Sequence, residues 1–243
     1  MKKLLVLSLI AGTVGGAHAA ELFNNGAVVD AAGLSIAQPN PPALTTLGLP
    51  SNPVISLAED FSVSSPGWNV QSLDFFGYQT GATAFTFTSV TWSILAGTNA
   101  NTASLVASGT TSVTNGGLVG FRVTSTTLTN TQRPIYRISA DIPDITLDAG
   151  SFFVTWSLAG TGASGPFVPG TLGSLGVTPG HALQGPVAGG SFVDPLNNLS
   201  QPLFLGAPFA IQGSVIPEPS TYALMLAGGL AIGAIVRRRR QQG

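Results

Sequence analysis

The chain has 243 residues, of which only 8 % are charged, while Gly (31) and Pro (17) are abundant. This balance favours strands and turns over helices, and the absence of cysteine excludes disulfides, thiolate zinc sites and a cysteine nucleophile. Between the two ends of the chain, three arginines stand against nine acidic residues, a formal charge of −6 that disfavours nucleic-acid binding.

Residues 1–19 have the three parts of a cleavable Sec signal peptide, which is expected to be helical. Lys2 and Lys3 supply the positive start, an apolar run follows, and Ala17 and Ala19 provide the small-x-small cleavage pattern. Ala20 is then the first residue of the mature chain. The alternative is a permanent anchor, but the apolar run is short and interrupted by glycine. The sequence therefore predicts export through the inner membrane.

Residues 20–53 are rich in proline and show little periodicity. They predict an irregular lead-in with one short strand near residues 27–30 and no other regular element.

From residue 54 to residue 213, apolar and polar residues alternate in short segments between turn signals, which predicts eight to ten strands. Since each strand must bury its apolar face against a second sheet, the predicted fold class is all-β, an antiparallel two-sheet β-sandwich. The strands are expected at residues 54–63, 68–78, 85–95, 105–108, 118–128, 134–142 and 151–158, with weaker candidates at 182–184, 191–193 and 203–212.

Two details follow from the same patterns. The apolar set changes phase after Phe87, which predicts a β-bulge at residues 88–90. The dipeptides within Asn115-Gly116-Gly117 predict a hairpin turn.

Candidate catalytic and metal-binding residues are few. His181 is the only histidine after residue 19, and no Gly-x-Ser-x-Gly motif accompanies it, so a locally hydrogen-bonded histidine is the preferred interpretation. Asp141, Asp144 and Asp148 could offer oxygen ligands to Ca²⁺, but their spacing matches no calcium-loop pattern. We expect Asp141 and Asp148 to be turn residues at a strand exit, and we predict no metal site, no cofactor and no enzymatic activity.

Acidic and aromatic residues leave two further alternatives open. Glu59 and Asp60 are adjacent in a predicted strand and should point to opposite faces, which disfavours a local glycosidase pair. Tryptophan and tyrosine could stack on sugar rings at an exposed site. Trp92 and Trp156 fall in apolar sets and are expected in the core, whereas the positions of Trp68 and Tyr78 are ambiguous, with Tyr78 near a rim.

The C-terminal tail, residues 215–242, has three parts. An extended segment, Pro217-Glu218-Pro219, precedes an apolar run at residues 222–236, and a stop-transfer cluster follows at Arg237, Arg238, Arg239 and Arg240. As a helix the apolar run measures about 22 Å, which is short for a stable transmembrane span. A short transmembrane helix that serves as a temporary anchor is therefore preferred over a permanent one.

This order of elements resembles the PEP-CTERM sorting signal of Gram-negative, exopolysaccharide-producing bacteria. The resemblance implies recognition by an exosortase, a membrane transpeptidase, near Pro217-Glu218-Pro219, after transient anchoring in the inner membrane. Residues 59–78 and 149–156 resemble parts of the sandwich domains found on many proteins with this tail, which implies a jelly-roll-like sandwich but no particular activity.

The sequence as a whole predicts a non-enzymatic protein of the cell surface or extracellular matrix that an exosortase sorts. The alternative is a polysaccharide-binding module with exopolysaccharide as a partner, and a hydrolase is the less favoured third possibility.

Overall fold

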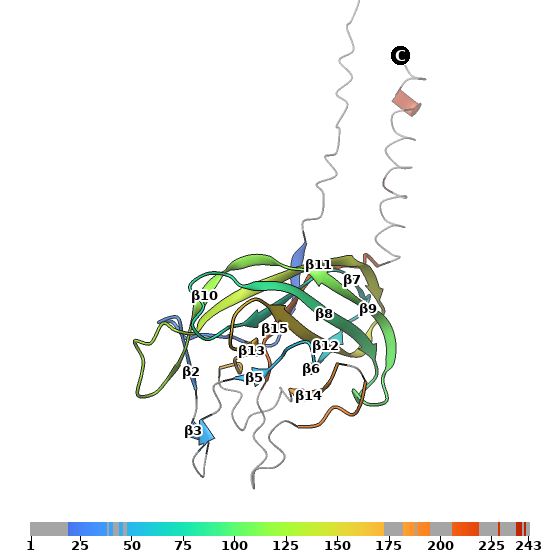
Figure 1. The fold of residues 1–243 in the computed structure, drawn as a ribbon. Coiled ribbons are helices and arrows are strands. Elements are labelled where there is room, and N and C mark those ends of the chain that lie inside the picture. Colours follow the sequence, from blue (N-terminus) through green and yellow to red (C-terminus); the bar gives the residue numbers. More distant parts are fainter. Residues whose placement is uncertain are drawn as a thin grey trace, which may run out of the picture.

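The protein folds into two large β-sheets that pack face to face (Figure 1). This computed structural model describes residues 19–37, 39–40, 44–45, 48–172, 182–187, 189–194, 206–218, 228, 237–239 and 241. One sheet has six strands in the order β1-β15-β7-β11-β10-β2, and the other has five in the order β14-β6-β12-β8-β9. Two short pairs, β13-β5 and β3-β4, lie outside these sheets. The all-β class is therefore confirmed.

The strands of the six-stranded sheet are β1 (Ala20–Asn24), β15 (Phe209–Val215), β7 (Trp68–Gly77), β11 (Pro134–Leu147), β10 (Thr114–Thr124) and β2 (Leu34–Ala37). Those of the five-stranded sheet are β14 (Leu183–Pro186), β6 (Ile55–Val63), β12 (Gly150–Gly160), β8 (Phe87–Ala96) and β9 (Ser104–Ser112). The short strands are β3 (Pro39–Asn40), β4 (Leu44–Thr45), β5 (Leu49–Pro50) and β13 (Phe167–Val168).

The core lies between the two sheets and is dominated by aromatic side chains. The Trp156 ring of β12 stacks on the Phe75 ring of β7 at a centroid distance of 5.2 Å and lies 5.9 Å from Phe209 of β15. Trp156 has no exposed surface and Trp92 is 3 % exposed, so both lie in the core as predicted. Trp68 and Tyr78 are also buried, and the suggested rim position of Tyr78 is wrong. Burial of these large aromatic side chains stabilises a sandwich that has no disulfides.

The predicted bulge in β8 is confirmed. Ala159 of β12 pairs with Ser89 and Gly160 pairs with Phe87, so Thr88 is an extra residue. Phe87 and Val90 both point inward as a result.

The hairpin predicted at Asn115-Gly116-Gly117 is wrong, because these residues belong to β10. Gly116 lies in a second β-bulge. Asn115 pairs with Ile138 and Gly117 pairs with Arg137, so Gly116 has no partner in the register. A Cβ atom at Gly116 would lie 2.8 Å from the Arg137 side chain, so the bulge has room only for glycine.

The lead-in is more regular than predicted. It supplies β1 and β2, the two edge strands of the six-stranded sheet, whereas residues 27–30 form no strand. The β2–β10 pair is parallel, an exception to the antiparallel arrangement.

The two ends of the folded domain meet in one sheet. The first strand, β1, pairs with the last strand, β15, at one edge of the six-stranded sheet.

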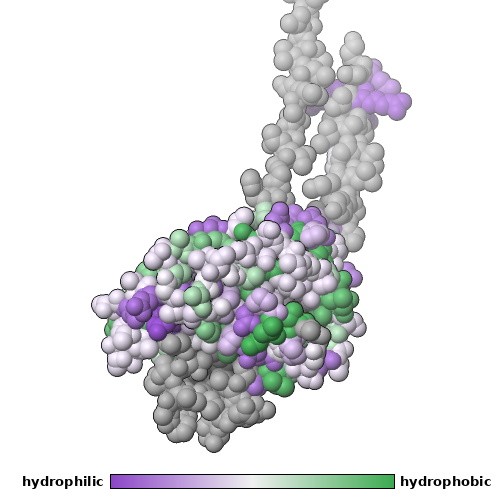
Figure 2. Space-filling view, viewed as in Figure 1, coloured by the Kyte–Doolittle hydropathy of each residue, from purple (hydrophilic) through white to green (hydrophobic). Residues whose placement is uncertain are grey.

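The surface carries few strongly hydrophilic residues. Figure 2 shows mostly pale side chains, with small purple and green patches, on the displayed face. This agrees with the low share of charged residues in the sequence.

Candidate functional site

The sorting tail begins where β15 ends. Val215, the last residue of β15, pairs with Trp68, and the Ile216 amide donates a hydrogen bond of 3.0 Å to the Gly67 carbonyl oxygen. Pro217 and Glu218 follow directly and are exposed. The folded sheet therefore extends to the residue before the Pro-Glu-Pro segment.

Gly67 allows this closure of the sheet. Its φ of +113° suits glycine, and a Cβ atom there would lie 2.6 Å from the Leu147 carbonyl oxygen and 3.0 Å from the Ile216 side chain. The tight turn before β7 thus places the Gly67 carbonyl oxygen beside the Ile216 amide.

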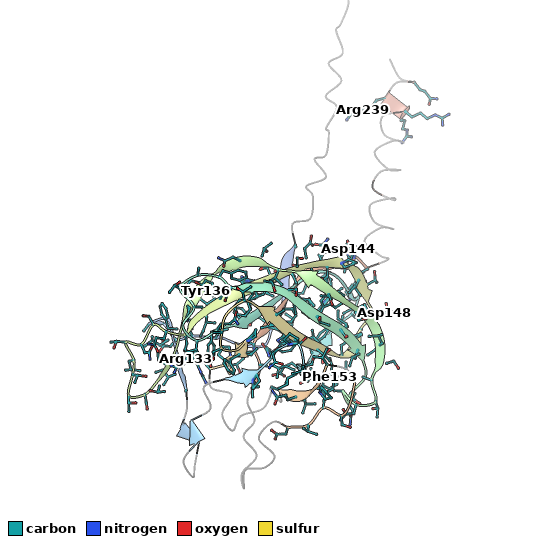
Figure 3. All side chains as sticks on the ribbon, viewed as in Figure 1. Arg133, Tyr136, Asp144, Asp148, Phe153 and Arg239 are labelled. Atoms are coloured by element: carbon teal, nitrogen blue, oxygen red, sulfur yellow. The ribbon has the colours of Figure 1, made fainter. Side chains whose placement is uncertain are left out.

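The other predicted tail residues are partly described. Arg237, Arg238 and Arg239 are helical and exposed (Figure 3 labels Arg239), whereas Pro219 and Arg240 lie outside the described residues. Of the apolar run at residues 222–236, only Gly228 is described, as helical. No helix within the described part of the chain is both long and apolar enough to span a membrane.

The predicted signal-cleavage site adjoins this same end of the sheet. Ala20 is the first residue of β1 and pairs with Gly213, near the end of β15. Ala19 is exposed, and Ala17 lies outside the described residues. Because β1 and β15 are antiparallel neighbours, the start of the described domain and the start of the sorting tail lie side by side.

A polar network fastens β15 to the middle of its sheet. Asp74 of β7 is 3 % exposed, and its carboxylate accepts hydrogen bonds from Arg137 and Ser139 of β11, each at 2.5 Å, and from Gln212 of β15 at 3.0 Å. The Arg137 guanidinium also lies 3.9 Å from the Glu21 carboxylate of β1. One buried carboxylate thus links β7, β11 and β15, and Arg137 extends the network to β1.

Glu59 is a second buried carboxyl group. It is 1 % exposed, and the Ala207 amide donates a 2.5 Å hydrogen bond to it. Burial, with a smaller contribution from the negative charge of Asp60, raises the pKa of Glu59 to about 8. Asp60, its neighbour, is exposed, so the two carboxylates point to opposite faces as predicted.

The Ala207 carbonyl oxygen accepts a 2.6 Å hydrogen bond from Asn25, whose own side-chain oxygen accepts from the Phe209 amide at 2.8 Å. Glu59 and Asn25 together hold the backbone that enters β15. A hollow of about 450 Å³ lies between this part of β6 and residues 23–26. A single buried carboxyl group bonded to a backbone amide suits a structural role better than general acid–base catalysis.

A larger hollow of about 630 Å³ lies on the outer face of the five-stranded sheet, and we call it the outer hollow. Asp60 and Ser62 of β6 and Ser151 and Phe153 of β12 line it, together with the β8–β9 loop and residues 192–194. Figure 3 labels Phe153 on the sheet. The sequence carries no local signal for this hollow, because its walls come from segments about 90 residues apart.

The remaining predicted candidates do not converge on a site. Asp141 and Asp144 lie within β11, so Asp141 is not a turn residue, and Asp144 accepts a 3.1 Å hydrogen bond from Asn69. Asp148 lies in the turn between β11 and β12. Within the described residues, no three acidic or histidine side chains form a metal-binding group. His181 lies outside the described residues.

Comparison with known proteins adds one finding. A family model described as the PEP-CTERM protein-sorting motif matches residues 215–240. No curated protein and no solved structure matches the chain. The match agrees with the tail predicted from the sequence, and such a motif implies export, processing by an exosortase, and a place at the cell surface or outside the cell.

Proposed function

Because the chain carries a PEP-CTERM sorting motif, we propose that it is a non-enzymatic surface or matrix protein whose tail anchors it transiently in the inner membrane before an exosortase cuts near Pro217-Glu218-Pro219. The short apolar run and the arginine cluster that follows it support transient anchoring over permanent insertion. On this proposal, the mature protein consists of the sandwich alone.

One structural observation carries the proposal: the sheet ends at the motif. The Ile216 amide donates a hydrogen bond to the Gly67 carbonyl oxygen, and the exposed Pro217 and Glu218 come next. Neither proline can donate a backbone hydrogen bond, so the segment cannot extend β15 as a strand. A cut in this segment would release a domain with its core intact.

Replacement of Pro217, Glu218 and Pro219 by alanine tests the proposal. The variant should accumulate in the inner-membrane fraction with its tail uncut, while the wild-type protein appears outside the cell. A matched control replaces Gln241, Gln242 and Gly243 by alanine, beyond the arginine cluster, and should be processed normally. Equal release of both variants would contradict the proposal.

A second function, polysaccharide binding, is favoured by the outer hollow. It is concave, it lies on an outer sheet face, and hydroxyl, amide, carboxylate and aromatic groups line it. A hydrolase has weaker support, because Glu59 and Asp60 point to opposite faces.

A further inference from the structure

The outer hollow has the size and shape of a ligand site. Its volume of about 630 Å³ falls within the range of small-molecule and oligosaccharide pockets. Its floor is formed by outward-facing residues of two paired strands, since Asp60 pairs with Phe153 and Ser62 with Ser151. The floor is therefore part of the rigid sheet.

The two walls of the outer hollow are tied to each other. The Asn101 side chain of the β8–β9 loop donates to the Phe192 carbonyl oxygen at 2.9 Å and accepts from the Phe192 amide at 2.6 Å. This paired contact fixes the backbone of residue 192 beside the loop. The part-exposed Phe192 ring then packs with Leu183 against buried Phe153 and Ala58.

The loop itself is held in shape by short-range contacts. The Asn101 amide donates to the Asn99 side-chain oxygen at 2.9 Å, and the Ala103 amide donates to the Asn99 carbonyl oxygen at 2.9 Å. The Gly97 amide donates to the Ser151 carbonyl oxygen at 2.9 Å, which joins the loop to the floor. Since little ordering remains to be done on binding, the hollow is preorganised for a ligand.

The negative charge of the outer hollow disfavours acidic ligands. Two carboxylates, Asp60 and Asp194, line the outer hollow, and none of its described lining residues is basic. The body also carries a net formal charge of −6 between the two ends of the chain. An acidic polymer would meet repulsion on approach and in the site. A neutral sugar offers hydroxyl donors to the carboxylates and an apolar ring face to Phe192.

We propose that the outer hollow binds a short stretch of a neutral polysaccharide, with Asp60 accepting hydrogen bonds from sugar hydroxyl groups and Phe192 packing against a sugar ring. This inference rests on the polysaccharide-binding function given above and names its site and its ligand class. It is independent of the sorting tail.

Affinity electrophoresis of the full chain in mild nonionic detergent tests the proposal. Gels contain a neutral glucan, a neutral galactomannan, an acidic alginate or a basic chitosan. We expect retardation in at least one neutral gel and no dependence on ionic strength, because a neutral ligand forms no ion pairs. Retardation in alginate or chitosan alone would overturn the charge argument.

Two variants locate the site. Asp60→Asn and Phe192→Ala should each weaken binding to the neutral polymer about tenfold or more, as expected for one charge-assisted hydrogen bond or one stacked ring. Asp141→Asn and Leu118→Ala, exposed positions on the other sheet, are the matched controls and should bind like the wild type. Unchanged thermal unfolding midpoints would show that the variants are folded.

The outcomes distinguish failure of the polysaccharide-binding function from failure of the outer hollow as its site. If no polysaccharide retards the wild type, the polysaccharide-binding function fails with its site. If the wild type is retarded and Asp60→Asn and Phe192→Ala are retarded equally, the function stands and the outer hollow is overturned as its site.

Discussion

The Ile216 amide donates a hydrogen bond of 3.0 Å to the Gly67 carbonyl oxygen, one residue before Pro217. Gly67 lies in the turn before β7, so the contact fixes the end of β15 against the start of its neighbouring strand. The position of the sorting motif relative to the domain therefore depends on this turn.

Gly67→Ala should destabilise the domain by about 1–3 kcal/mol, because a side chain at φ +113° is strained and its Cβ atom would lie 2.6 Å from the Leu147 carbonyl oxygen. Urea unfolding measures the loss. Gly81→Ala is the matched control: its φ of +83° is also positive, but nothing lies within 4 Å of the added Cβ atom. Equal losses in the two variants would contradict the role of the contact at Gly67.

A flexible Gly-Ser-Gly-Ser insertion between Ile216 and Pro217 should speed processing. The motif now starts directly at the sheet, and a transpeptidase that takes an extended peptide must approach the folded domain closely. The spacer moves the motif away without changing any strand contact. Pulse-chase labelling with separation of precursor and mature forms gives the processing rate. A slower or unchanged rate would contradict the idea that the nearby folded domain limits access of the exosortase to the motif. The same spacer placed after Arg240 is the control.

The free energy of unfolding should depend on the ionisation of Glu59. Burial raises the pKa of this carboxyl to about 8 from its ordinary value of 4.5, so in this pH range the folded chain binds a proton that the unfolded chain has lost. Between about pH 4.5 and pH 8, this group makes the free energy of unfolding fall as pH rises, and its effect levels off above that window.

Glu59→Gln removes this dependence while keeping an oxygen that can accept from the Ala207 amide. The variant should match the wild type near pH 4 and exceed it at pH 8 by an amount on the order of a few kcal/mol. Urea unfolding of both proteins across this range gives the difference. A difference that does not grow with pH would show that Glu59 is not held neutral.

Asp74→Ala should destabilise the domain by about 2–4 kcal/mol, because it removes the acceptor of three hydrogen bonds and leaves Arg137 without its nearest carboxylate. Asp141→Ala, at an exposed position of β11, is the control and should change stability by less than about 0.5 kcal/mol. A similar small change in both variants would mean that the network adds little.

The alternation of apolar residues predicted most long strands of the sandwich, because burial of one face is a local property of the sequence. The bulge at Thr88 was predictable for the same reason, since Phe87 and Val90 must both point inward. The turn at Asn115-Gly116-Gly117 was mispredicted because glycine serves both turns and bulges, and only the pairing partner in β11 distinguishes them.

The edge strands and the outer hollow could not be predicted, because they depend on long-range contacts. β1 is a strand because it pairs with β15, about 190 residues later, and its own sequence shows no clear alternation. The Asn101 contact to the backbone of Phe192 likewise has no local signal. The sorting tail was predictable because its recognition depends on the order of short segments and not on the fold.

Mass spectrometry of the C-terminal peptide of the mature protein, recovered from outside the cell, tests the central claim most directly. Exosortase processing predicts a last peptide that ends near Pro217-Glu218-Pro219 and no peptide from residues 222–240. Recovery of residues 222–240 still joined to the sandwich in the released protein would contradict it.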